Sequence, residues 1–113
     1  MAITEIFRDD WKSALTDFSR DHEGWLARVQ EFGPGTGSHE QAQGMPFIGL
    51  EVEGHAPHLS VSVILGTETD DHVTHTVTSP TQVWNKTGED AMEDVLEIHS
   101  ADGLTMILRL RRG

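Results

Sequence analysis

The chain has 113 residues, no cysteine, and a net charge of −11 from 19 acidic and 8 basic side chains. This length suits one domain with its own core, and the lack of cysteine excludes disulfides and thiolate metal sites. No Lys or Arg occurs between Arg28 and Lys86. Because nucleic acids and anionic membranes attract basic side chains, we expect neither as a partner. The acidity is consistent with binding of a basic partner or a cation, and equally with a role in solubility or in adaptation to salt.

The hydropathy of the chain bears on its location. No segment approaches about 18 consecutive apolar residues, and the N-terminus has no apolar run of signal-peptide length. We therefore expect a soluble cytoplasmic protein. No internal repeat or linker divides the sequence, so we expect one domain over residues 1–113.

The only helical pattern covers residues 9–23. Trp11, Leu15 and Phe18 recur at helical spacing and predict one apolar stripe. Gly24 suits the end of the helix. We expect this amphipathic N-terminal helix to pack against a sheet through the stripe.

Alternating patterns fill most of the remaining sequence, and residues 58–66 carry the clearest one. They predict an α+β fold, with the N-terminal helix packed on a twisted, mostly antiparallel sheet of six or seven strands. The sheet could be open or could curl toward a partial barrel. The expected strands are residues 25–32, 39–44, 47–53, 58–66, 72–79, 81–86, 95–100 and 104–111.

Two hairpins allow the register to be predicted. Pairing Val63 with His75 keeps the apolar residues of both strands on one face, so His75 should point inward and His72 outward. In the last hairpin, a three-residue turn with Gly103 in the left-handed region aligns Leu96 with an apolar residue of the next strand.

The 7 histidines raise the hypothesis of a metal-binding or pH-responsive site. His55 and His58 flank a turn, which brings residues i and i+3 within about 7 Å. Asp70, Asp71 or His72 could add a third ligand for zinc or another divalent ion. The alternative is that these are solvent-exposed loop histidines without a site, and no cofactor is then needed.

One catalytic hypothesis concerns His75. An inward histidine could act as the base of a small hydrolase or isomerase. The alternative is a partly buried histidine that is hydrogen-bonded to the backbone. No other group of residues has a convincing catalytic pattern.

A binding role is the main hypothesis. Ile64 and Ile107 point away from the face assigned to the helix, and Trp84 is a further candidate for this surface. We therefore expect a non-enzymatic binding or accessory module that acts through a sheet face, either on a protein partner or as a homodimer. The sequence leaves any small-molecule ligand open.

Several segments, which span most of the chain in order, are similar to one known family: 10–11, 18–26, 45–50, 70–77 and 96–103. Through these segments the sequence resembles the uncharacterised prokaryotic domain-of-unknown-function family 5335. The resemblance implies no activity and no site residues.

Overall fold

The computed structural model describes residues 2–34, 37–55, 58–66, 72–87 and 92–112, and for residues 37–43 it describes the backbone alone. One short helix and eight strands make up this part of the chain. The elements in order are β1 (Ala2–Ile6), a 3-10 turn η1 (Arg8–Asp10), α1 (Trp11–His22), β2 (Leu26–Gly33), β3 (Gly37–His55), β4 (His58–Leu65), β5 (Val73–Thr78), β6 (Pro80–Thr87), β7 (Glu93–Ser100) and β8 (Thr105–Arg111).

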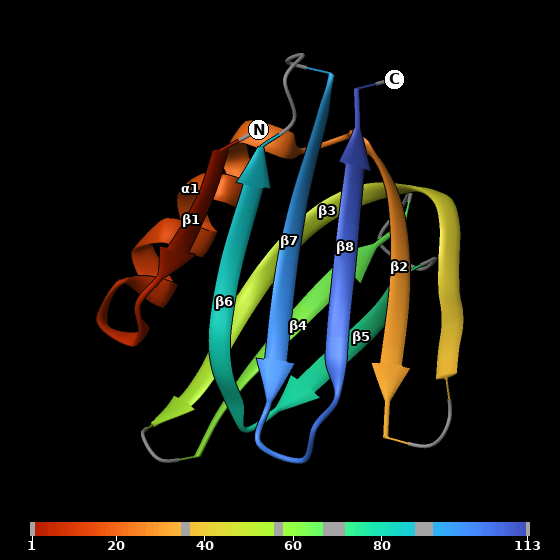
Figure 1. Ribbon diagram of the computed structural model, residues 1–113. Coiled ribbons are helices and arrows are strands. Elements are labelled where there is room, and N and C mark those ends of the chain that lie inside the picture. The colour runs from red at the N-terminus through yellow and green to blue at the C-terminus, as the bar shows by residue number, and fades with distance from the viewer. Residues whose placement is uncertain (1, 35–36, 56–57, 67–71, 88–91, 113) are drawn as a thin grey trace.

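The strands form one antiparallel sheet in the order β1-β6-β7-β8-β2-β3-β4-β5. The sheet folds over into two layers, with β1, β6, β7, β8 and β2 in front and β4 and β5 behind (Figure 1). Among the described residues, β1 and β5 have one neighbouring strand each, so the sheet is open.

The long strand β3 connects the two layers. Its first part pairs with β2 as far as Pro46, and its second part pairs with β4 from Phe47 onward. The register shifts beside Gly44, whose φ of +71° suits glycine, and such a bulge bends a strand. The separate strands predicted at 39–44 and 47–53 are therefore two halves of one bent strand.

The predicted number of six or seven strands is wrong because β1 was not expected. This strand pairs with β6, which lies about eighty residues further along the chain, so its partner could not be inferred from neighbouring sequence. The helix is consequently not the first element. It begins at Trp11, after the turn η1, and Phe7 is 65% exposed between β1 and that turn.

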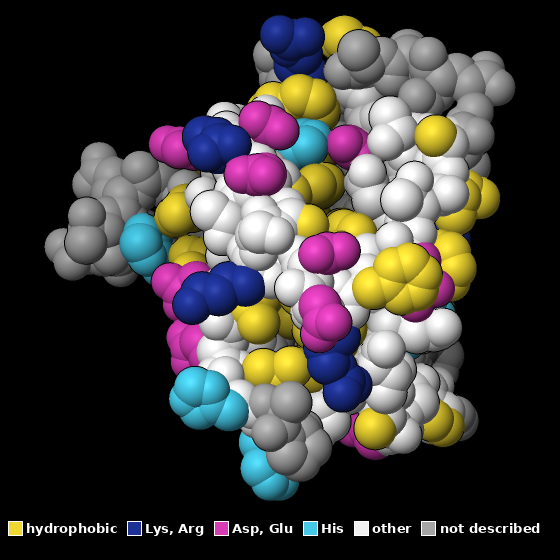
Figure 2. Space-filling model, turned by 90° about the vertical axis from the view of Figure 1, so that its left-hand side faces the viewer, with side chains coloured by type: hydrophobic (Ala, Val, Ile, Leu, Met, Phe, Trp, Pro, Cys, Tyr) yellow, Lys and Arg dark blue, Asp and Glu magenta, His cyan; other side chains and the backbone are white. Residues whose placement is uncertain are grey.

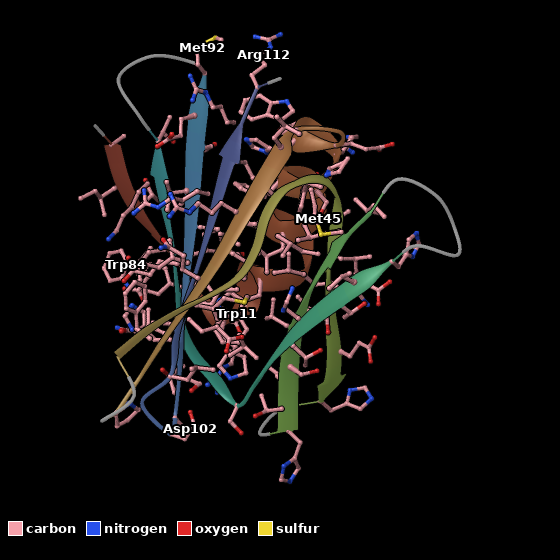
Figure 3. The ribbon with its side chains drawn as sticks, turned by 90° about the vertical axis from the view of Figure 1, so that its right-hand side faces the viewer. Trp11, Met45, Trp84, Met92, Asp102 and Arg112 are labelled. Atoms are coloured by element: carbon pink, nitrogen blue, oxygen red, sulfur yellow. The ribbon has the colours of Figure 1, made fainter. Side chains whose placement is uncertain are left out.

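The core lies between the layers, and α1 covers one side of it. Figure 3 shows Trp11 between the two layers. The Trp11 indole Nε1 donates to the Ile6 carbonyl at 2.7 Å, which satisfies the one polar atom of this buried ring. The fully buried side chains come from α1 and from both layers: Trp11, Leu15, Ala27, Val29, Phe47, Val61, Val63, Leu65, Val77, Val83, Leu96, Ile98, Met106, Leu108 and Leu110.

Helix α1 is tied to β3 by Ser19. The Ser19 hydroxyl accepts the Leu50 backbone N–H at 2.8 Å and donates to the Leu15 carbonyl at 2.7 Å. Gly49 lies beside this contact, and a Cβ there would be in ordinary van der Waals contact with the Ser19 Cβ at 3.6 Å. The predicted stripe is thus buried against β3 and the core.

Both predicted hairpin registers are confirmed. Val63 pairs with His75, which is half-buried on the inner face, while His72 is exposed. In the last hairpin the Ser100 N–H donates to the Leu104 carbonyl at 2.8 Å, and Gly103 has a φ of +89°.

Candidate functional site

The predicted metal ligands do not come together. His55 and His58 are cross-strand partners at one end of β4, and both are exposed. His72 precedes Val73, which pairs with Leu65 at the other end of β4. Seven residues of strand separate these ends by about 23 Å. The structure therefore places His72 far from His55 and His58.

The other predicted ligands are the two aspartates before His72. Asp70 and Asp71 lie outside the described residues. Within the described ranges, no group of three His, Asp or Glu side chains is placed to hold an ion. Figure 2 likewise shows histidine side chains at separate places on the surface.

His75 has no geometry suited to a base. Its Nε2 atom is buried and has no hydrogen-bond partner among the residues that the structure describes. A general base must reach the proton of its substrate, and a buried nitrogen cannot do so without movement of the core. The position of His75 therefore gives the hydrolase or isomerase hypothesis no support.

The front layer presents a continuous apolar band on its outer face, which is the face turned away from the core. Four adjacent strands, β1, β6, β7 and β8, contribute one apolar side chain each. Ile3 lies directly opposite Lys86, and Trp84 lies directly opposite Glu97. Each apolar residue is therefore the diagonal neighbour of the apolar residue on the next strand. Figure 3 shows Trp84 on the outside of this layer. We call this set the apolar band: Ile3, Trp84, Val95 and Ile107.

Two of the charged side chains between these apolar residues pair with each other. Glu97 forms an ion pair with Lys86, and its other oxygen lies 3.1 Å from Nε2 of His99. Nδ1 of His99 lies 3.2 Å from the Thr105 hydroxyl. A neutral imidazole that donates from Nε2 and accepts at Nδ1 satisfies both contacts. Lys86 and Glu97, which lie between Ile3, Trp84 and Val95, are therefore paired charges.

Three shallow hollows cross the same face, with volumes of about 320, 280 and 390 Å³. The first and second share Arg109 and Glu93, and the second and third share Ile3 and Lys86. The hollows consequently form one continuous surface. It runs from an arginine-rich corner on β2 and β8 to Trp84 on β6.

The predicted surface residues divide between the two layers. Trp84 and Ile107 share the outer face of the front layer. Ile64 lies on β4 between the buried Val63 and Leu65, so it faces outward from the back layer. Ile64 therefore cannot belong to the same surface as Trp84 and Ile107.

Sequence reasoning missed several residues of this face. Ile3 could have been found from the alternating segment 2–6, which has a strand pattern before the helix. Arg28, Arg109 and Arg111 alternate with buried residues on their strands, but their meeting depends on the pairing of β2 with β8. Local sequence carries no signal for that pairing.

A second polar group lies inside the fold, between α1 and β7. The His22 Nε2 atom is 2.9 Å from an Asp94 carboxylate oxygen, and the His22 Nδ1 atom is 2.7 Å from the Phe18 carbonyl. Asn85 donates to the other Asp94 oxygen at 2.8 Å. The His22 ring stacks on Phe18 with centroids 4.1 Å apart, and the side-chain exposures of His22 and Asp94 are 10% and 14%. This geometry attaches the helix to the front layer and offers no access for a ligand.

Comparison with known proteins places the chain in a family. The model of a family described as "Family of unknown function (DUF5335)" matches residues 2–113. The chain belongs to the DUF5335 family. The resemblance found in the sequence is thereby confirmed, and membership assigns no activity. No curated protein and no solved structure matches the chain.

The described α-helix of this DUF5335 member, α1, has 12 residues. In the part of the chain that the structure describes, no helix is long and apolar enough to span a bilayer.

Proposed function

We propose that the chain is a non-enzymatic binding module that docks a partner protein through the outer face of β1, β6, β7, β8 and β2. The observation that carries the proposal is the apolar band, which crosses four adjacent strands and lies along three connected hollows. Ile3 at its end is 58% exposed. Connected apolar residues on an otherwise charged surface are typical of interaction sites.

The charge of this face favours an acidic partner. Among the side chains that the structure describes, it carries four of the 8 basic ones, and Lys86 and Arg109 both lie directly beside the apolar band. The described acidic side chains on these five strands of the face are Glu5, Glu93 and Glu97, out of 19 in the protein. The described part of the face is therefore slightly positive on a protein whose net charge is −11. Complementary charge speeds association and orients the partner.

The proposal can be tested with a display library of random short peptides selected on the wild-type protein. Peptides that combine apolar and acidic residues should be enriched, and Ile107→Ser should weaken their binding about tenfold or more, as removal of a central interface residue does. Ile64→Ser is the matched control, because it removes the same side chain from the outer face of the other layer. Equal binding by both variants, or an equal loss in both, would contradict the proposal.

Size-exclusion chromatography with light scattering tests whether this face instead binds a second copy of the chain. We expect a monomer at high protein concentration. A dimer that Ile107→Ser dissociates and Ile64→Ser does not would show that the face binds another copy of this chain and would overturn the proposed acidic partner.

A further inference from the structure

The first strand of the chain lies at an edge of the sheet. Strand β1 pairs with β6 along its whole length, from Ala2 to Ile6. Among the described residues no strand lies on the other side of β1, and α1 runs behind it (Figure 1). In an antiparallel sheet, every second residue of an edge strand directs its backbone N–H and C=O away from the neighbouring strand. The Trp11 indole uses the Ile6 carbonyl, so the free part of this edge runs from Ala2 to Glu5.

The sequence of β1 does not protect this edge from further pairing. Edge strands of native proteins are commonly protected by lysine, by proline or by a bulge. Residues 2–6 contain no lysine and no proline, and their pairing with β6 has no register shift. The one charged side chain of β1 is Glu5. The edge can therefore accept the backbone of another extended chain.

Exposed apolar side chains lie along the same edge. Ile3 and Phe7 are 58% and 65% exposed, more than any other large apolar side chain that the structure describes. Phe7 directly follows β1 and is itself extended, with φ −76° and ψ 155°. Side chains four residues apart on an extended segment point to the same side. Ile3 and Phe7 therefore flank Glu5 on the outer side of β1, where an added strand would cover them.

We infer that the partner binds in part by adding an extended segment to the free edge of β1. The inference rests on the proposed function and specifies how the same surface is recognised. A row of free backbone N–H and C=O groups is matched by the backbone of another extended chain, which is the basis of recognition by strand addition. Ile3 is also the first member of the apolar band, so the added strand and the band form one continuous surface.

The cross-strand neighbours predict the residue pattern of the added segment. Its residue opposite Ile3 should be apolar, because apolar cross-strand pairs stabilise a sheet. Its residue two positions away, opposite Glu5, should not be acidic, because like charges that lie directly opposite are destabilising. The acidic residues expected of the partner should then lie outside the paired segment, over the strands that carry Lys86 and Arg109.

A scan of backbone methylation tests the inference on the tightest-binding peptide from the display selection. Each backbone N–H of this peptide is replaced in turn by N–CH3, which removes the donor and leaves the side chain unchanged. Only alternate N–H groups of an added strand face its neighbour. We therefore expect the affinity to fall about tenfold or more at every second residue and to change little between them. Losses without this two-residue period, or no loss at any residue, would overturn the inference.

Amide hydrogen exchange locates the bound peptide on the protein. Bound peptide should slow the exchange of alternate backbone amides between Ala2 and Glu5, because these amides become hydrogen-bonded. The amides of β5, the other edge strand, should exchange at the same rate with and without peptide. Unchanged exchange in β1, or slower exchange in β5 instead, would overturn the inference.

A pair of variants tests the contribution of the exposed side chains at the edge. Phe7→Ser should weaken peptide binding about tenfold, as loss of an apolar anchor does. Val73→Ser is the matched control, because it removes an apolar side chain that is 39% exposed from the other edge strand. Circular dichroism of both variants checks that each one is folded. Equal peptide affinities of the wild type and the two variants would count against strand addition at β1.

Ile107→Ser separates this inference from the proposed function. A peptide that needs Ile107 but shows no alternating effect of methylation would leave docking on the apolar band intact and overturn strand addition. A peptide that shows the alternating effect and binds Ile107→Ser as tightly as the wild type would support strand addition and overturn docking on the band. The absence of any enriched peptide would overturn both.

Discussion

Replacement of His22 by Leu tests whether a polar contact holds the helix on the sheet. The substitution keeps an apolar side chain of similar size next to Phe18 and Trp25, whose rings lie 4.1 and 4.6 Å from the histidine ring. It removes the contacts of His22 with the Phe18 carbonyl and the Asp94 carboxylate. Both of these partners are acceptors, so both contacts are hydrogen bonds only when both ring nitrogens carry a proton.

The expected cost follows from the two contacts. A neutral hydrogen bond contributes about 1 kcal/mol, and one to a charged group about 1.5–3 kcal/mol. Asp94 keeps its hydrogen bonds from Asn85 and from the Val95 backbone, which limits the penalty for leaving its charge partly buried. We therefore expect His22→Leu to lower the free energy of unfolding by about 3 kcal/mol, which corresponds to roughly 10 °C in melting temperature for a domain of this size.

Urea denaturation of the wild type, His22→Leu, Asp94→Asn and the double variant provides the measurement. The coupling energy between the two positions should be about 1–2 kcal/mol, as for residues in direct contact. The control is His99→Leu, because His99 also contacts a carboxylate, that of Glu97, but its side chain is 34% exposed. Its cost should stay below about 1 kcal/mol. Equal costs for the two histidines, or no coupling between His22 and Asp94, would refute this explanation of how α1 is held.

Three further predictions concern single contacts. Ser19→Ala should destabilise the fold by about 1–2 kcal/mol in urea titrations, since the Leu50 N–H loses its acceptor. Gly103→Ala should cost about 1–2 kcal/mol, because φ is +89° and the added Cβ would lie 2.9 Å from the Pro34 ring, and a neutral result would contradict this turn geometry. A hydrogen bond from a serine hydroxyl, together with backbone N–H groups, lowers the pKa of Asp102. A lowered pKa stabilises the folded state above the unfolded pKa of about 3.9, and the effect is lost as the pH falls through the lower folded value. Asp102→Asn should therefore remove part of the acid-induced loss of stability. Identical pH profiles of the free energy of unfolding for the wild type and the variant would refute this.

The local sequence was sufficient to predict several features of this protein. Alternation and the requirement to bury one face determined the pairing of Val63 with His75. The residues of the last turn determined that Gly103 lies in the left-handed region, and they determined the register of the last hairpin. The apolar stripe through Trp11 and Leu15 predicted which side of the helix is buried. Each of these depends on residues that are close together in the chain.

The tertiary structure decided the surfaces on which function would act. The pairing of β1 with β6 and of β2 with β8 joins segments about eighty residues apart, and it alone brings Ile3 beside Trp84 and Arg28 beside Arg109. The length of β4 likewise separates His72 from the histidines at its other end. Spacing along the sequence specifies which face of a strand a side chain occupies, but not which strand lies next to it. The choice of neighbouring strand follows from packing of the whole core, so the apolar band and the pairing of Arg28 with Arg109 could be recognised only in the folded chain.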